Sequence, residues 1–262
     1  MGDNILTMIK VIELPIDKDM GGLTSYVLQL YRMIDKKEFE LTLLSYDDSQ
    51  NFDVNYNVET VSRPYHIIQF YKKMKCLLSE EKNIIHFHQS YVNIIPILIA
   101  KLAGFKTIIL HAHSSSIDDN RKIVRFLKTG LHKVGRFLLP YLVDTYIGCS
   151  TKASEWMFPR TCIDSDSYYL LHNAIDLDLY DRNINLGLEV RQKFNIPKDA
   201  LVVGHIGRFT PVKNHPFIID IFKEVLKQNP NSYLFLLGDG VERHKIESLV
   251  KSAAISDKVI FM

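Results

Sequence analysis

The sequence predicts an α/β protein made of two domains, each with a doubly wound parallel sheet, the second of them incomplete. Short apolar, β-rich runs alternate with stretches of helical periodicity. The runs are almost continuously apolar, as expected for strands that are covered on both faces. The pattern is interrupted once, over the polar and strand-poor residues 176–200, and then resumes. We therefore predict an N-terminal domain over residues 1–172 and a C-terminal domain over residues 173–262.

The N-terminal half contains five predicted strands, with helices between most of them. They cover residues 9–14, 41–45, 84–88, 107–111 and 145–148. After the first strand, Gly21 and Gly22 precede a helix, because the apolar residues from Leu23 to Ile34 keep helical spacing.

The C-terminal half repeats the alternation on a smaller scale. Strands are predicted at 202–206, 233–237 and 259–261, and helices at 216–228 and 242–254. In the first helix the apolar pairs 217/218, 221/222 and 225/226 recur every four residues and predict one buried face. Complete α/β domains usually need more than the roughly 100 residues available here, so we expect the second domain to be incomplete.

The composition favours a soluble globular protein with ample core material, since 47% of the 262 residues are hydrophobic and 24% are charged. A net charge of +2 is too small to indicate a nucleic-acid partner. The three cysteines, Cys76, Cys149 and Cys162, have no paired spacing, which fits a reducing cytosol. We recognise no signal peptide at the N-terminus, and the most apolar stretch, 94–100, is too short to span a bilayer. The sequence therefore predicts a cytoplasmic location.

Residues 204–222 place cations where a predicted strand leads into a helix. Arg208 follows the strand, Lys213 precedes the helix, Asn214 is a candidate cap, and Pro216 lies in the first turn. Helix N-termini present free N–H groups and the positive end of the helix dipole, and ligands bind at the carboxyl ends of parallel strands. This pattern predicts a phosphate site, although an arginine and a lysine in an ordinary polar loop would look similar.

A second glycine-rich turn, Gly238-Asp239-Gly240, follows the next strand. By itself it could be a simple connector. In combination with Arg208 and Lys213 it indicates that residues 202–240 form a strand, loop, helix and strand that hold the diphosphate of a sugar nucleotide.

At this point the chain resembles glycosyltransferase family 4, which has the GT-B architecture of two facing Rossmann-like domains. The matching segments occur in the family's order: Gly21-Gly22, His111-Ala112-His113, Asn173-Ala174-Ile175-Asp176, Gly207-Arg208-Phe209, Lys213-Asn214 and Gly238-Asp239-Gly240. The branch that makes bacterial capsules and exopolysaccharides is the most similar.

The resemblance implies roles for these residues. Arg208 and Lys213 would bind the donor diphosphate and stabilise it as the leaving group, together with the segment 238–240. Gly21 and Gly22 would let backbone N–H groups approach the same phosphate. His113 would lie beside the donor sugar, although a histidine packed at a strand end is the alternative. His86 and His88 end another strand and are expected to be acceptor-side or structural residues.

The implied reaction is retaining transfer of a sugar from a nucleotide-diphosphate donor to a glycan or a lipid-linked acceptor. The departing diphosphate itself would help to deprotonate the incoming hydroxyl, so no general base from the protein is assigned.

Family members carry a pair of glutamates after the Gly-Asp-Gly segment, and this sequence ends before such a pair. A truncated, inactive fragment that acts as a binding or partner subunit is therefore an alternative, as is another GT-B enzyme such as a sugar-nucleotide epimerase. The donor sugar, base, acceptor and linkage are not predicted.

No obligatory metal or cofactor is expected. Asp176-Leu177-Asp178 and Asp164-Ser165-Asp166 resemble an Asp-x-Asp metal motif, but neither follows an apolar strand. The His-x-His pairs 86/88 and 111/113 have no third ligand of suitable spacing along the chain. A Gly-x-Gly-x-x-Gly fingerprint is absent after the first strand, which disfavours an oxidoreductase.

Residues 121–138 form a basic segment without acidic residues. On a helical projection its six cations share one arc and its apolar residues fill the opposite arc. Such segregation suits a helix on an anionic membrane surface. An ordinary helix that packs on a core and exposes a basic face would show the same pattern, and the sequence leaves both interpretations open.

Overall fold

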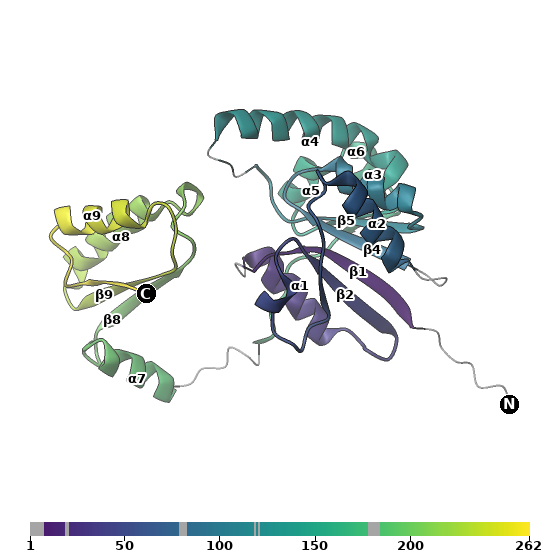
Figure 1. Ribbon diagram of the computed structural model, residues 1–262. Coiled ribbons are helices and arrows are strands. Elements are labelled where there is room, and N and C mark those ends of the chain that lie inside the picture. The colour runs from purple at the N-terminus through teal and green to yellow at the C-terminus, as the bar shows by residue number, and fades with distance from the viewer. Residues whose placement is uncertain (1–7, 19–20, 79–82, 118, 120, 178–183) are drawn as a thin grey trace. The chain divides into compact units, whose positions relative to one another are not determined.

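The computed structural model describes residues 8–18, 21–78, 83–117, 119, 121–177 and 184–262. The chain divides into two compact units, Met1–Leu177 and Asp178–Met262 (Figure 1). The division lies five residues after the predicted boundary at 172.

The first unit is built on a seven-stranded parallel sheet with the order β3-β2-β1-β4-β5-β6-β7. Its strands are β1 (Ile9–Ile16), β2 (Phe39–Ser45), β3 (Val58–Thr60), β4 (Asn83–Gln89), β5 (Thr107–Ala112), β6 (Thr145–Gly148) and β7 (Tyr168–Leu170). The chain proceeds outward from β1 in one direction to β3 and then returns to β4 on the other side of β1. The carboxyl ends of β1 and β4 therefore flank the reversal of strand order, where open α/β sheets bind ligands.

Helices cover the two faces of this sheet unequally. On one face lie α2 (Ile67–Leu77), α3 (Ile94–Ala103), α4 (Lys122–Leu142), α5 (Thr151–Met157) and α6 (Arg160–Ile163), which enclose the main core. On the other face α1 (Gly22–Met33) packs Val27 and Leu28 against Ile16 and Leu43. A short 3-10 helix, η1 (Ser49–Asn51), follows β2.

Side-chain alternation gives the central strands one apolar and one polar face. Ile85 and Phe87 of β4 point into the main core, together with Ile108 and Leu110 of β5. Because successive side chains of a strand point to opposite faces, the residues between them lie on the face that also carries α1. These residues include histidines, which form the candidate site described below.

The second unit holds a three-stranded parallel sheet with the order β10-β9-β8. Its elements are α7 (Ile184–Lys193), β8 (Leu201–Ile206), η3 (Pro211–Lys213), α8 (His215–Gln228), β9 (Ser232–Leu237), α9 (Arg243–Ser252) and β10 (Val259–Phe261). Phe209, Ile219, Phe222 and Leu234 are among the residues of its core.

The predicted strands are all present, whereas two details of α8 were predicted wrongly. Its buried residues include His215, Ile219 and Phe222, while Phe217 and Ile221 are 58% and 50% exposed. The buried stripe therefore begins at His215, two residues before the first pair of the predicted repeat. Asn214 precedes α8 as predicted, but its side chain makes no capping hydrogen bond. The strands β3 and β7 were not predicted, because three residues are too few to show alternation.

Candidate functional site

The cations of the second unit lie in the loop between β8 and α8. Arg208 and Lys213 are both exposed, and within the described part of the chain neither has a hydrogen-bond or ion-pair partner from its side chain. The loop leaves the carboxyl end of β8, next to the carboxyl end of β9, with which β8 pairs in parallel. Two uncompensated cations at this edge can bind an anion.

Backbone hydrogen bonds connect this loop to the Gly-Asp-Gly turn. The amide of Phe209 donates to the Asp239 carbonyl at 2.8 Å, and the amide of Glu242 donates to the Phe209 carbonyl at 3.0 Å. Gly238 and Gly240 have φ angles of +139° and +151°, which favour glycine. A Cβ on Gly240 would stand 2.6 Å from the Phe209 carbonyl oxygen, so only glycine permits this approach.

Arg243, at the start of α9, supports the same turn. Its Nη1 donates to the Gly238 carbonyl at 2.9 Å, its Nε donates to Glu247 at 3.0 Å, and its guanidinium lies over the ring of Phe209. Sequence reasoning missed this residue, since an arginine in a helical first turn carries no visible signal. The glycines and Arg243 together hold the β8–α8 loop in place, and direct contact of residues 238–240 with a diphosphate stays a prediction.

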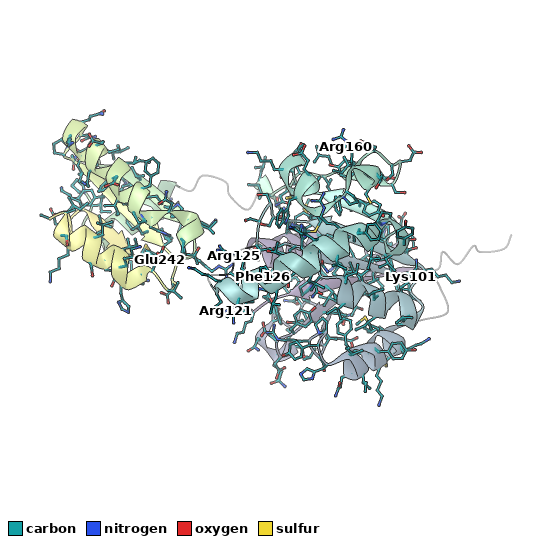
Figure 2. The ribbon with its side chains drawn as sticks, turned by 90° about the horizontal axis from the view of Figure 1, so that it is seen from above. Lys101, Arg121, Arg125, Phe126, Arg160 and Glu242 are labelled. Carbon is teal, nitrogen blue, oxygen red and sulfur yellow. The ribbon has the colours of Figure 1, made fainter. Side chains whose placement is uncertain are left out.

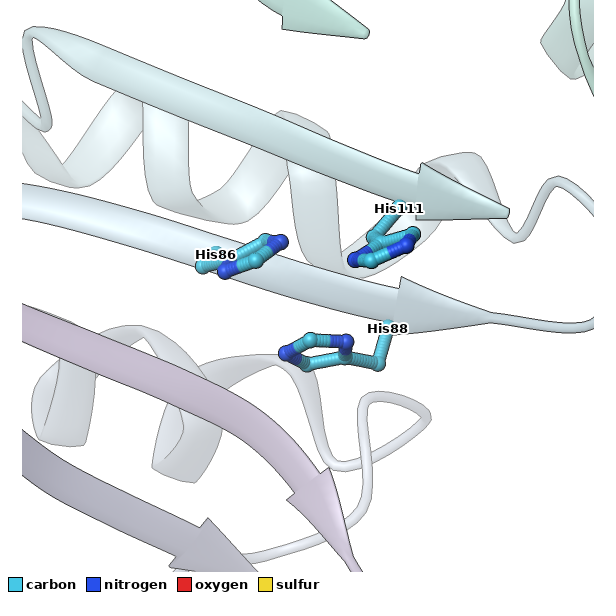
Figure 3. A group of neighbouring side chains, drawn as sticks. All are labelled: His86, His88 and His111. Atoms are coloured by element: carbon cyan, nitrogen blue, oxygen red, sulfur yellow. The ribbon is translucent and has the colours of Figure 1, made fainter. Parts of the chain in front are cut away.

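A histidine cluster occupies the polar face of the first unit's central strands. His86 and His88 come from β4, His111 from β5 and Glu13 from β1, and each is at most 6% exposed. Figure 3 shows the three imidazoles facing one another across the two neighbouring strands. His88 and His111 are register partners in the parallel ladder, which brings them together despite their separation in sequence.

Glu13 is the hydrogen-bonding centre of the cluster. Its carboxylate lies 2.6 Å from His88 Nε2 and 3.0 Å from His86 Nδ1. On the other side of the ring, His88 Nδ1 lies 2.8 Å from Nε2 of His113, the residue that follows β5. In contrast, both ring nitrogens of His111 and Nε2 of His86 are buried without a hydrogen-bond partner in the described part of the chain.

Burial and the neighbouring side chains together determine the protonation of these groups. Burial raises the pKa of the Glu13 carboxyl, but the electrostatic interaction with His86 and hydrogen bonds from His86 and His88 outweigh burial and hold that pKa well below its usual range. Burial and then the neighbouring His86 lower the pKa of His88 to about 4. Burial and then His88 lower the pKa of His113 to about 3, so His88 and His113 are neutral near pH 7.

The predicted site residues of the first unit gather at the same edge of its sheet. Gly21 and Gly22 begin α1, and Tyr26 on this helix lies 5.3 Å from His113, measured between ring centroids. No protein atom lies within 4 Å of a Cβ placed on Gly22, so the space beside it is open. The structure thus brings the α1 start together with His113 in one unit, and Arg208 and Lys213 together with 238–240 in the other.

A cavity of about 240 Å³ adjoins His88 in the first unit. Its lining combines aromatic, apolar and polar side chains: Pro15, Asp17, Leu23, Tyr46, Phe87, His88, Gln89, Ser90, Tyr91, Asn93 and Pro96. It lies at the carboxyl ends of β1 and β4, where the strand order reverses.

The basic segment forms α4, and most of its apolar residues face outward. Ile123, Phe126, Leu127, Val134, Phe137 and Tyr141 are 59–77% exposed. The buried stripe consists instead of His132, Gly135 and Leu139. The helix therefore exposes an apolar stripe of its own, which the core-packing interpretation did not include. Figure 2 labels Phe126 of this stripe and its neighbour on the helix, Arg125.

Two of the predicted cations share one carboxylate, since Asp119 pairs with Arg121 at 3.0 Å and with Lys128 at 2.9 Å. Lys122, Arg125 and Lys133 are exposed. No helix in the described ranges combines the length and apolarity needed to cross a bilayer.

Of the two acidic pairs that resemble a metal motif, only Asp164 and Asp166 both lie within the described residues. Asp164 pairs with Arg160 at 3.1 Å, and Asp178 lies outside the described residues. The expectation concerned ligands spaced along the chain, and the structure adds His111, which approaches His86 and His88 from the neighbouring strand. Ring nitrogens of His86, His88 and His111 lie within 4.8 Å of one another, because neighbouring strands supply what sequence spacing did not.

The chain matches two known protein families. The family described as Glycosyltransferase Family 4 matches residues 20–179, which is more than half of the chain, and the family described as Glycosyl transferases group 1 matches residues 188–262. The chain belongs to glycosyltransferase family 4. This confirms the resemblance and makes the protein a glycosyltransferase by family rather than an epimerase.

Relatives of this family 4 chain include a putative and a named bacterial glycosyltransferase. EpsF of Bacillus subtilis is 24% identical over 97% of this chain and 68% of its own length. The Escherichia coli UDP-Gal:alpha-D-GlcNAc-diphosphoundecaprenol alpha-1,3-galactosyltransferase is 21% identical over 88% of this chain and 62% of its own length. The chain thus spans about two thirds of the length of these two relatives.

Solved structures support the fold. HepE of Anabaena, crystallised with UDP and glucose, is 14% identical and superposes with a TM-score of 0.75 over 98% of this chain and 69% of its own. Together with the two parallel sheets, this confirms the predicted GT-B-like fold class.

Proposed function

We propose that the protein transfers a hexose or a related sugar, with retention of configuration, from a nucleotide-diphosphate donor to a glycan or lipid-linked acceptor on the cytoplasmic side of the membrane. The product would belong to a surface polysaccharide such as a capsule. Family membership supports the reaction class. The observation that carries the proposal is the pair of exposed cations, Arg208 and Lys213, on a loop held by the glycines of the next turn.

In this proposal Arg208 and Lys213 bind the diphosphate and stabilise the charge that grows on it as the sugar–oxygen bond breaks. Their loop is fixed by backbone hydrogen bonds before donor arrives, so the charges need little reorganisation during the reaction. Because two cations supply this stabilisation, transfer requires no metal ion. The oxygen of the departing diphosphate accepts the proton of the incoming hydroxyl, and positioning provides most of the remaining catalysis.

The first unit would hold the donor sugar and the acceptor. A hydrogen bond between its Nε2 and His88 Nδ1 orients His113. The His88 ring is held in turn by Glu13, through Nε2. The neighbouring cavity, with Tyr46 and Tyr91 in its wall, has the mixture of rings and polar groups that suits an acceptor sugar. Gly22 would leave room for the diphosphate next to the α1 N-terminus.

A thermal-shift screen of nucleotide-diphosphate sugars tests the diphosphate site. We expect a matching donor to raise the melting temperature of the chain, and Arg208→Ala and Lys213→Ala each to remove most of that increase. Lys223→Ala is the matched control, because Lys223 is an exposed lysine on α8 that pairs only with Asp220 among the described residues. Stabilisation by donor that survives both loop substitutions would overturn the proposal.

We further propose that α4 binds the surface of an anionic membrane. The helix exposes an apolar stripe that includes Phe126 and Phe137, and Lys122, Arg125 and Lys133 are exposed along it. Cations beside exposed rings match the negative headgroups and acyl boundary of such a surface. An interfacial position would bring the enzyme close to a lipid-linked acceptor.

Co-flotation with vesicles tests this second proposal. The chain should bind vesicles rich in phosphatidylglycerol and bind phosphatidylcholine vesicles much less. Burying one phenylalanine is worth about 1.5–3 kcal/mol, so Phe126→Ser should weaken binding by roughly tenfold or more. Phe217→Ser, which changes an exposed phenylalanine of the second unit, is the control. Equal binding to both kinds of vesicle, or no effect of Phe126→Ser, would exclude α4 as the contact.

A further inference from the structure

We propose that His86, His88 and His111 bind a divalent first-row metal ion, zinc above all, and that Glu13 is the outer carboxylate that orients two of the three rings. The proposed transfer chemistry needs no metal ion, and the two proposals share His88, whose Nδ1 also orients His113. Three observations support the site: the rings converge, His86 and His111 have unpaired ring nitrogens, and Glu13 lies beside two of the rings.

The three imidazoles converge from two adjacent strands in the interior of the first unit. Ring nitrogens of all three lie within 4.8 Å of one another, as Figure 3 illustrates. Both nitrogens of His111, and Nε2 of His86, are buried and have no hydrogen-bond partner in the described part of the chain. Buried polar atoms without partners are costly and rare, and a bound ion is one of the few ways to satisfy several of them together.

Glu13 supplies the second, independent observation. Its carboxylate holds His86 through Nδ1 at 3.0 Å and His88 through Nε2 at 2.6 Å. When an N–H on these atoms donates to Glu13, the opposite nitrogens, His86 Nε2 and His88 Nδ1, carry lone pairs. Metal-ligating histidines almost always have such an arrangement, with the other ring N–H donated to a carboxylate or carbonyl. The buried negative charge of Glu13 also favours a cation beside it.

The chemistry of the ligand set selects the metal. Neutral imidazoles suit zinc, and tetrahedral zinc accepts three histidines and a fourth ligand. The three histidines leave that fourth position for a water molecule. Zinc–nitrogen bonds of about 2.0–2.1 Å put ligand nitrogens roughly 3.3 Å apart. Nitrogens that lie up to 4.8 Å apart would therefore approach by as much as about 1.5 Å on binding. Such closure would tie β4 to β5 and stabilise the first unit.

Zinc titration of the purified chain, freed of metal with EDTA and dialysed, tests the proposal directly. Competition between the chain and a chromophoric chelator for zinc should show that each chain binds one ion. Cobalt(II) should give the intense visible absorption bands of a four-coordinate site. His86→Ala and His111→Ala should each lower zinc affinity at least tenfold. His66→Ala, which removes an exposed histidine before α2, is the control and should leave it unchanged.

A milder variant keeps the test decisive if a histidine substitution prevents folding. Glu13→Gln retains all three ligands and should lower zinc affinity by about 10–100-fold, as the loss of an outer-shell partner typically does. Zinc should also raise the melting temperature of the unchanged chain and of His66→Ala, but not that of His111→Ala. Absence of one-to-one binding, or binding equally tight in Glu13→Gln, His86→Ala and His111→Ala, would overturn the site. None of these readouts depends on glycosyl transfer.

Discussion

The histidine cluster of the first unit and the cationic loop of the second lie at equivalent places, toward the carboxyl ends of parallel strands, but they are constructed differently. Glu13, His88 and His111 are at most 1% exposed, and Glu13 and His88 bond within the cluster. Arg208 and Lys213 are exposed, and their position depends on the backbone beneath them rather than on side-chain partners. The cluster is thus a buried, hydrogen-bonded network. The loop instead presents two exposed cations that can bind an anion.

This difference separates two kinds of consequence for mutations. Changes in the buried network should act first on stability, because a partner removed from a low-dielectric interior leaves other groups unpaired. Changes to the exposed cations should act on binding and rate with little effect on folding. The following predictions test that separation.

The largest effect is expected from Glu13→Ala. Breaking a buried pair by removing one partner costs about 3–5 kcal/mol, because the remaining group is left without compensation. Urea unfolding in metal-free buffer, followed by the fluorescence of Trp156, reports on the first unit, since this is the chain's single tryptophan. Glu40→Ala, at an exposed pair with Lys10, is the control and should cost less than about 1 kcal/mol. Equal costs for the two variants would contradict a rigid buried network.

Arg208→Ala should have the next largest effect, on catalysis instead of stability. Loss of a preorganised charge at a leaving group costs about 3–4 kcal/mol of transition-state stabilisation, or roughly 10²–10³-fold in kcat/KM. Transfer or donor-hydrolysis assays measure the rate, and urea unfolding should show no change. A variant that loses stability along with activity would place Arg208 in the folded framework rather than in an open charge site.

Gly238→Ala should destabilise the second unit by about 1–3 kcal/mol. The residue has a φ of +139°, and a Cβ there would meet the backbone of Gly207. Hydrogen exchange of β8 and β9 amides measures the loss. Gly204→Ala is the matched change, because no protein atom lies within 4 Å of its Cβ position. If Gly204→Ala increases the exchange of these amides as much as Gly238→Ala does, the close approach of Gly238 to Gly207 is unimportant for the stability of the unit.

The smallest effect should come from Gly22→Ala. Its Cβ would meet no protein atom within 4 Å, so the stability of the first unit should be unchanged. If the α1 N-terminus faces the donor diphosphate, the methyl group should weaken donor binding by about tenfold, which corresponds to about 1.4 kcal/mol. Calorimetric titration with the donor measures this, and unaltered affinity would remove Gly22 from the site.

Elements and motifs that depend on neighbours in the chain were predictable. The apolar run of β6 and the glycines of the 238–240 turn are local signals, because strand length and positive φ follow from nearby residues. The outward stripe on α4 was not predictable, although its segregation of charge was visible. A helical projection shows one apolar arc without saying which part of it is buried. Only packing reveals that Gly135 and Leu139 face the core while Phe126 and Phe137 do not.

The sequence by itself determined the parallel α/β class, the order of the elements, the family, and the placement of Arg208 and Lys213 between a strand and a helix. Each of these depends on residues that are adjacent or regularly spaced. Only the tertiary structure decided that His111 joins His86 and His88 over a carboxylate from β1. The reason is physical: a parallel sheet places side by side strands that are separated by whole helices along the chain, so register, and not sequence spacing, determines which side chains meet.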